Sequence, residues 1–207
     1  MNRYLQEFLE ISSARHTHLC PRQVLGARIA LAGGAALGFE LPRHDKRMLI
    51  ILETDGCFAD GIEAATDCTV GHRTLRIEDY GKIAATCVDA QTRQALRIAP
   101  RLDVRERAYD YAPGESRHYF AQLKGYQIMP DDELLTIQSV QLTTPVSKII
   151  SRPGVRVNCE NCGEEIINER EVILSGHVFC HTCALGGYYC QQETLETPQF
   201  LFQQAVK

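Results

Sequence analysis

Two pairs of cysteines near the end of the chain constrain its fold more than any other feature. Cys159 and Cys162 are separated by two residues, as are Cys180 and Cys183, and seventeen residues lie between the pairs. Each Cys-x2-Cys pair can turn two sulfurs onto one ion, so this spacing predicts a four-cysteine zinc site. A segment of about 50 residues has too small a core to be stable alone, and zinc is expected to supply the missing stability. A mononuclear iron site of rubredoxin type and a disulfide or redox pair are the alternatives.

The residues between the two pairs predict a treble-clef zinc finger. Gly163 allows a tight turn after the first pair, and residues 171–179 can form a hairpin with Gly176 at its tip. The second pair then opens a helix, which gives the order of knuckle, hairpin and helix that is typical of this finger. We expect Cys190, seven residues further on, to be a small buried thiol and not a fifth ligand.

The distribution of charge argues against a nucleic-acid partner. The net charge is −4, and residues 153–207 carry all of it, with three basic and seven acidic side chains. A nucleic-acid reader needs clustered lysines and arginines to displace counterions from phosphates. Binding of DNA or RNA by the finger is therefore not expected.

The cysteines and the apolar segments indicate a cytoplasmic protein. Nine cysteines are an odd number, four of them lie in the paired motif, and charged residues among the first 15 positions exclude a secretory signal. The longest charge-free apolar run, residues 29–39, falls short of the roughly 20 residues that cross a bilayer. We expect a reducing compartment and no membrane partner.

Residues 1–152 are expected to form one α+β domain, and residues 153–207 the finger domain with a C-terminal helix. The composition shifts toward proline, serine and glycine over residues 143–154, which marks the boundary. Apolar periodicity and turn residues predict helices at 1–15, 21–37, 58–65 and 116–123, and strands at 48–52, 74–78, 82–88, 94–99 and 134–142. Helices and strands in this mixture indicate an α+β core.

A second group of metal-binding side chains lies before the helix expected at residue 21. His16, His18 and Cys20 fall within five residues, directly before Pro21, and the helix terminus there favours the thiolate form of Cys20. Cys57 follows the strand at 48–52 and a glycine turn, so it is a third candidate ligand. In the alternative interpretation one histidine caps the helix, the other is solvated, and Cys20 is a core residue.

Four ordered motifs resemble the FmdE-like family, which is named after a component of formylmethanofuran dehydrogenase. They are His16-x-His18-Leu-Cys20-Pro, Asp55-Gly-Cys57-Phe-Ala-Asp60, Cys68-Thr-Val-Gly71 and Asp79-Tyr-Gly-Lys82. The resemblance implies a thioredoxin-like mixed sheet flanked by helices, a metal-binding active site on that core, and an auxiliary treble-clef finger. Carried onto this chain, the core site would use His18, Cys20 and Cys57, with His16 close by, and would hold zinc or another divalent transition metal.

The sequence departs from the family pattern at two places. Thr17 and Arg22 stand where the family usually has glycines around the His-x-His-x-Cys-Pro motif. His72 and Arg73 add side chains after the third motif, which either change the ligand of the pocket or lie on the surface.

The family name points to the molybdenum or tungsten enzyme that reduces carbon dioxide to formylmethanofuran. This chain has no further cysteine runs for iron–sulfur clusters and is too short for large pterin-binding domains. We therefore expect a metal-binding protein accessory to one-carbon metabolism, with subunits of that dehydrogenase as partners. The alternatives are a stand-alone metal-dependent enzyme with Asp60 or Glu63 as proton carrier, a thiol redox enzyme using Cys20 and Cys57, and a regulator whose finger contacts another protein.

A homodimer is a further expectation. Aromatic residues gather in one polar segment, and more lie close to the end of the chain. They are Tyr109, Tyr111, Tyr119, Phe120, Tyr126, Phe200 and Phe202.

Overall fold

The computed structural model describes residues 3–190 and divides the chain into two compact units, Met1–Ile150 and Ser151–Lys207. No helix within the described range is long and apolar enough to cross a membrane. That the two units fold independently remains a prediction.

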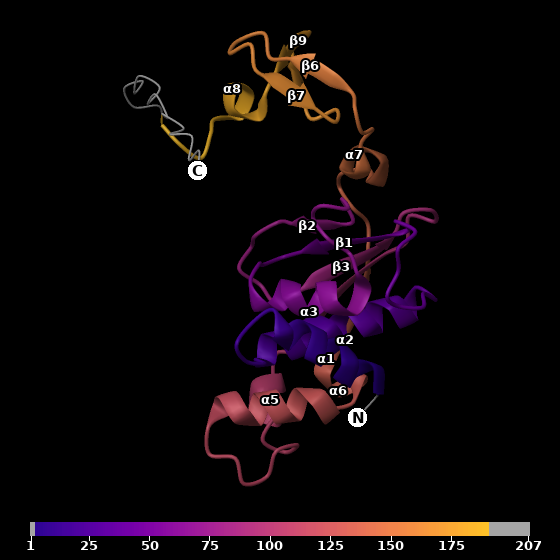
Figure 1. The fold of residues 1–207 in the computed structure, drawn as a ribbon, viewed down its shortest axis with the longest axis vertical. Coiled ribbons are helices and arrows are strands. Elements are labelled where there is room, and N and C mark those ends of the chain that lie inside the picture. Colours follow the sequence, from indigo (N-terminus) through magenta and orange to yellow (C-terminus); the bar gives the residue numbers. More distant parts are fainter. Residues whose placement is uncertain (1–2, 191–207) are drawn as a thin grey trace, which may run out of the picture. The chain divides into compact units, whose positions relative to one another are not determined.

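The N-terminal unit contains a five-stranded mixed sheet (Figure 1). Its strands are β1 (Met48–Leu52), β2 (Leu75–Ile77), β3 (Ala85–Asp89), β4 (Ala95–Pro100) and β5 (Leu135–Val140). They lie in the order β2-β1-β3-β4-β5, with β2 parallel to β1 and the other neighbours antiparallel. The parallel pair requires a crossover, which α3 (Cys57–Thr66) provides between β1 and β2.

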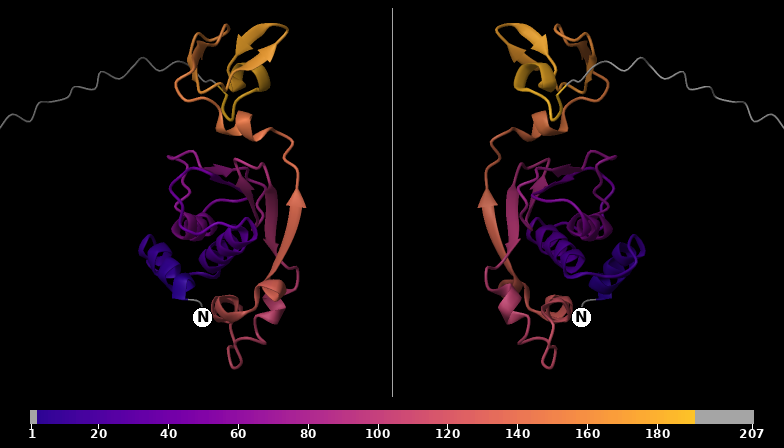
Figure 2. Two further views of the ribbon diagram at one scale, coloured as in Figure 1. Left: turned by 90° about the vertical axis from the view of Figure 1, so that its right-hand side faces the viewer. Right: turned by 90° about the vertical axis from the view of Figure 1, so that its left-hand side faces the viewer.

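Helices pack against one face of this sheet. They are α1 (Arg3–Ala14), α2 (Pro21–Ala36), α3 and α5 (His118–Ile128), with the short α4 (Val104–Arg107) and α6 (Asp131–Leu134). The short α7 (Val146–Ile150) lies on the opposite face. Figures 1 and 2 show α1, α2 and α3 on the same side of the sheet. Because side chains alternate along a strand, Met48, Ile50 and Leu52 of β1 join these helices in the core. Leu49 points to the other face and packs with Val146 of α7.

The backbones of α2 and α3 touch, and two glycines make this possible. A Cβ atom on Gly61 would lie 2.2 Å from the carbonyl oxygen of Gln23, and one on Gly26 would lie 2.3 Å from that of Phe58. Real Cβ atoms do not approach so closely, so any larger residue would push the helices apart. The N-termini of α2 and α3 are thereby held beside each other.

The C-terminal unit consists of two small hairpins and a short helix. β6 (Arg156–Asn158) pairs with β7 (Glu165–Ile167), and β8 (Val172–Leu174) pairs with β9 (His177–Phe179). Ser175 and Gly176 form the tip of the second hairpin with positive φ angles, as the turn requires. α8 (His181–Leu185) begins directly after Cys180.

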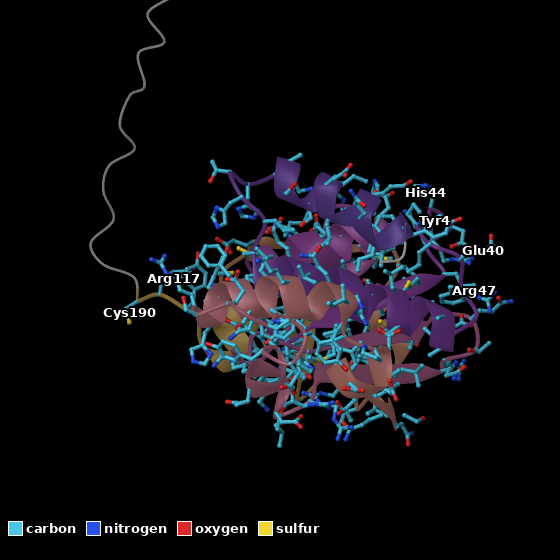
Figure 3. The ribbon with its side chains drawn as sticks, turned by 90° about the horizontal axis from the view of Figure 1, so that it is seen from below. Tyr4, Glu40, His44, Arg47, Arg117 and Cys190 are labelled. Atoms are coloured by element: carbon cyan, nitrogen blue, oxygen red, sulfur yellow. The ribbon has the colours of Figure 1, made fainter. Side chains whose placement is uncertain are left out.

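The α+β class with a mixed sheet flanked by helices is confirmed. The expected helices and strands occur within a few residues of their predicted bounds, except that the helix expected at 116–123 extends to Ile128. Two expectations about single residues were wrong. Cys190 is exposed and not buried (Figure 3), and Tyr126 is only 2% exposed, so it belongs to the core and not to a surface aromatic patch. Phe200 and Phe202 lie outside the described residues.

Candidate metal centres

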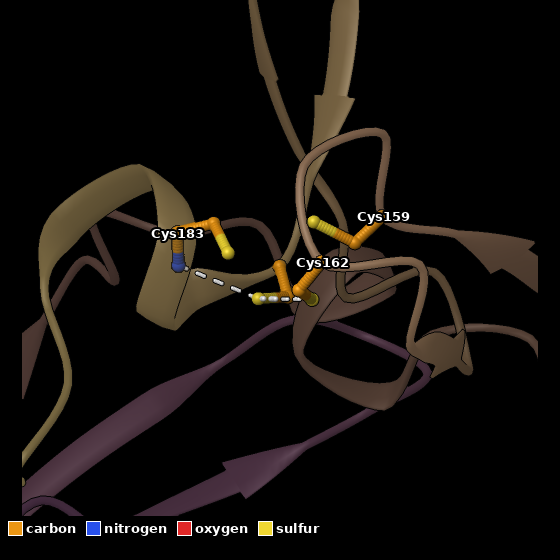
Figure 4. Close-up of side chains that lie close together, drawn as sticks. Cys159, Cys162 and Cys183 are labelled. Atoms are coloured by element: carbon orange, nitrogen blue, oxygen red, sulfur yellow. Dashed lines mark hydrogen bonds between the residues drawn. The ribbon is translucent and has the colours of Figure 1, made fainter. Parts of the chain in front are cut away.

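The four paired cysteines come together in the C-terminal unit. Cys159 and Cys162 lie in the turn between β6 and β7, and Cys180 and Cys183 lie at the start of α8. Their sulfur atoms are all within 4.8 Å of one another, and Figure 4 shows the sulfurs of Cys159, Cys162 and Cys183 converging. Four sulfurs in this arrangement fit a tetrahedral ion such as zinc, which prefers thiolate ligands in structural sites.

Backbone and side-chain amide N–H groups donate hydrogen bonds to the cysteine sulfurs, which favours their thiolate form. The turn closes when Gly163 donates to the carbonyl of Cys159 at 2.9 Å, with φ of 77° at the glycine. The side-chain amide of Asn161 donates to the sulfur of Cys183 at 3.2 Å, and the N–H of Cys183 donates to the sulfur of Cys180 at 3.4 Å. Such donors stabilise negative charge on sulfur.

The four thiols cannot all ionise easily without a cation between them. The backbone N–H groups of Cys162 and Cys180 lower the pKa of Cys159 to about 6. At Cys162 the backbone N–H of Glu164 acts in the same direction, but desolvation and the three neighbouring cysteines outweigh it and raise the pKa to about 12. A divalent ion removes this repulsion, so the donor set fits a bound metal.

In the N-terminal unit, Cys20 is fixed at the start of α2. Its backbone N–H donates to the side-chain oxygen of Gln23 at 2.7 Å, which satisfies one of the free donors of the helix end. The amide of Gln23 in turn donates to the backbone and side-chain oxygens of Ser12, at 3.0 and 3.1 Å. Because Gln23 and Ser12 are buried, this network holds the position of Cys20 against the end of α1.

Cys57 is the first residue of α3 and lies beside Cys20. Gly56, with φ of 70°, allows the sharp turn from β1 into α3. Burial raises the pKa of the Cys57 thiol, the neighbouring Cys20 side chain raises it further, and the guanidinium of Arg22 opposes the rise. Both cysteines are free thiols. The contact of α2 with α3 is thus what brings these two sulfurs together.

Cys20, Cys57 and His18 line one pocket of about 750 Å³. Its walls come from the start of α2, the turn from β1 into α3, the segment between β2 and β3, the segment from β4 to α4, and one side of α5. Tyr119 of α5 faces this pocket, and its hydroxyl donates to the carbonyl of Leu19 at 3.1 Å. Three arginines also line it: Arg22, Arg101 and Arg105.

His16 lies next to a different partner. Its Nε2 atom is 2.5 Å from a carboxylate oxygen of Asp60, and Arg15 forms an ion pair with Glu63 at 2.6 Å. These two acids of α3, which the sequence offered as candidate proton carriers, instead hold the loop that precedes α2. His16 is not among the described residues that line the pocket.

The predicted ligand set of the core site stays a prediction. Within residues 3–190, only the four finger cysteines place three or more ligand atoms within 4.8 Å of one another. His18, Cys20 and Cys57 line the same pocket, but they are not among the groups of the described residues whose ligand atoms converge in this way. His72 and Arg73 lie elsewhere: His72 faces a small pocket of about 100 Å³ with His44, and Arg73 donates to the carbonyl of Ile150.

Sequence patterns missed the far wall of the core pocket. Tyr119, Arg101 and Arg105 are each separated from Cys20 by about 80 or more residues, and no local motif marks them. Only their place in the folded unit identifies them.

Comparison with known proteins agrees with the fold and the motifs. A curated relative from Archaeoglobus fulgidus, named "Probable S-adenosyl-L-methionine-binding protein", is 25% identical over 195 residues. The match covers 84% of this chain and 51% of the relative, so this chain spans about half the length of that protein. A crystal structure of a tungsten formylmethanofuran dehydrogenase FmdE-like protein from Syntrophus aciditrophicus has the same fold, with a TM-score of 0.57, 19% identity, and coverage of 90% of this chain and 95% of that one. The family model described as "FmdE, Molybdenum formylmethanofuran dehydrogenase operon" matches residues 15–136, so the chain belongs to the FmdE family.

Proposed function

We propose that this protein is a metal-binding member of the FmdE family that is accessory to one-carbon metabolism. It holds a structural zinc ion in a treble-clef finger and a second, exchangeable divalent transition metal in the core pocket. The observation that carries the second site is the placement of Cys20 and Cys57 at the adjoining starts of α2 and α3, in the wall of a pocket that His18 also lines.

The core residues fit such an ion by their chemistry. Two thiolates and one imidazole are typical zinc ligands, and three protein ligands leave a coordination position for a molecule in the pocket. A metal bound there would act as a Lewis acid toward that molecule. Arg22 favours the thiolate form of Cys57, and the bond from Tyr119 to Leu19 fixes the loop that carries His18.

The finger and its partners are proposed from chemistry and family. Its negative charge suits a protein partner and not a nucleic acid. The family is defined by the operon of a molybdenum dehydrogenase, which supports association with subunits of such an enzyme in the cytoplasm. A homodimer is proposed from Tyr119 and Phe120, which are 41% and 40% exposed.

The ligand in the name of the Archaeoglobus relative is not carried over to this chain. S-adenosyl-L-methionine has a sulfonium and an ammonium group beside its single carboxylate, so it is a net cation at neutral pH. Arginines 22, 101 and 105 line the core pocket, and none of its described lining residues is acidic. Such a pocket disfavours a net cation.

One observation favours a second candidate, a thiol redox protein. Cys20 and Cys57 are neighbouring free thiols, and oxidation to a disulfide would release two protons and two electrons to an acceptor. The exposure of Cys57 to the pocket would give that acceptor access. This reaction and metal binding compete for the same sulfurs, so one experiment can separate them.

The test is the metal content of the purified chain and of three variants. We expect about two ions per chain in the parent protein, about one in Cys20→Ser and Cys57→Ser, and about two in Cys190→Ser, a matched change at an exposed cysteine. A parent protein with one ion, unchanged by Cys20→Ser, would refute the core metal site. If that protein also formed a Cys20–Cys57 disulfide with a mild oxidant, the redox candidate would replace it.

A further inference from the structure

Arginines line the core pocket, and acidic side chains of the described residues do not. Arg22, Arg101 and Arg105 line it, and among the described lining residues there is no aspartate or glutamate. The arginines come from two distant parts of the chain, the start of α2 and the segment from β4 to α4. Their positive charges therefore converge because the fold brings these segments to one cavity.

These three arginines form no close ion pair with an acidic side chain among the described residues. Within the described residues, Arg22 and Arg105 have no ion-pair partner, and Arg101 has only a contact of 3.9 Å with the exposed Asp103. Other arginines of this unit differ. Arg47 and Arg97 each form two hydrogen bonds to a carboxylate, with distances between 2.5 and 3.0 Å.

The nearby thiols can balance the charge of only one of these arginines. Arg22 lies close enough to Cys57 to favour its thiolate, which gives that arginine a role within the protein. Arg105 has no acidic partner among the described residues, and Arg101 has only the 3.9 Å contact with the exposed Asp103. Arginine forks match the oxygens of carboxylate and phosphate groups, so the unused groups suit an oxyanion that enters the pocket.

The remaining lining residues suit an organic molecule more than a bare inorganic ion. Leu25, Ile83 and Val104 provide apolar walls, and Leu102 lies fully exposed at the same pocket. A volume of about 750 Å³ is in the range of small-molecule sites. Covering the exposed side chain of Leu102 with an apolar group of the ligand would remove apolar surface from water, which favours binding.

We propose that this pocket binds an organic anion, whose carboxylate or phosphate group is held by Arg101 and Arg105 with Arg22, and whose apolar part covers Leu102. The inference goes beyond metal binding, because the arginines attract such a molecule whether or not an ion is held by the thiols. It names the class of molecule on which a metal in this pocket would act.

The experiment is calorimetric titration of the full chain with three probes of similar size. Benzoate and phenyl phosphate carry the two oxyanions, and benzamide is the neutral counterpart of benzoate. We expect at least one anion to bind, benzamide to bind more weakly by about tenfold or more, and anion affinity to fall as salt is raised. Which anion binds more tightly distinguishes a carboxylate from a phosphate ligand, and either result supports the proposal.

Single substitutions test which arginines bind the anion. Arg101→Gln and Arg105→Gln should each weaken anion binding by about tenfold, while Arg93→Gln, which removes the same charge from the turn between β3 and β4, should not. Both pocket arginines are exposed, so these changes leave the fold intact, and circular dichroism checks this. Benzamide binding as tightly as benzoate, or pocket variants that behave like Arg93→Gln, would overturn the proposal.

A repeat of the titration after mild chelation separates this proposal from the metal site. Anion binding that survives loss of the core metal, or that is found in a chain without one, supports the role of the arginines. Binding that chelation abolishes and that the arginine variants leave unchanged would refute the arginine site and leave the metal site standing.

Discussion

The close contact of α2 with α3 predicts that one added methyl group on Gly61 will damage both the stability and the core site. A Cβ atom there would lie 2.2 Å from the carbonyl oxygen of Gln23, whereas ordinary contacts begin near 3.4 Å. Relief requires the helices to separate by about 1 Å, because backbone atoms cannot swing away as side chains do. Overpacking of this kind costs about 1–3 kcal/mol, and the better helix propensity of alanine returns at most about 1 kcal/mol.

Gly61→Ala should therefore lower the free energy of unfolding by about 1–2 kcal/mol in urea denaturation followed by circular dichroism. Gln23 is also the residue that fixes Cys20. Separation of the helices should therefore weaken binding of the proposed core metal and leave the proposed finger ion in place. Gly34→Ala is the matched control. Gly34 also lies in α2, but its Cβ atom would meet only side-chain atoms of Leu41, a residue beyond the end of that helix. A side chain can move aside more easily than backbone, so we expect a much smaller change in stability and metal content than for Gly61→Ala. Gly61→Ala with the stability and metal content of the parent would refute this reasoning.

Two further predictions concern the finger and the sheet. Cys162→Ser or Cys183→Ser should lose the finger ion and unfold residues beyond about 155, because the metal supplies most of the stability of so small a unit; loss of the helical signal of the N-terminal unit would contradict this. Arg47 holds the pKa of the buried Asp89 well below its usual range, so their pair stabilises the fold above about pH 4 and loses this effect as the pH falls through the folded pKa. The stability gap between the parent protein and Asp89→Asn should be constant near neutral pH and shrink below about pH 4; a gap independent of pH would show that the charge is not responsible.

The sequence predicted those parts of the molecule that local rules determine. The spacing of the paired cysteines, Pro21 at the first turn of α2, and the short apolar run of β1 all act over a few positions. The same rules mark Gly56 as the turn that presents Cys57. Each of these features was found close to its predicted place.

Local rules failed where the outcome depends on contacts between distant segments. The pairing of His16 with Asp60 joins residues 44 positions apart, and no pattern around His16 distinguishes that partner from a metal. Cys190 looked like a buried thiol by residue type, but the segment around it has no element to cover it among the described residues. Residue type alone gives a tendency to be buried, and packing decides the result.

The core pocket exists because α5 is fastened to α2 at both of its ends. Near one end, the hydroxyl of Tyr119 donates to the carbonyl of Leu19, just before α2. Near the other, the buried guanidinium of Arg28 donates to the carbonyls of Tyr126 and Met129, both at 2.6 Å. A buried arginine is costly unless its donors are satisfied, so these bonds make any detachment of α5 unfavourable. The wall that α5 contributes to the pocket is therefore a fixed part of the fold. The proposed metal and anion would meet a wall that is already in place.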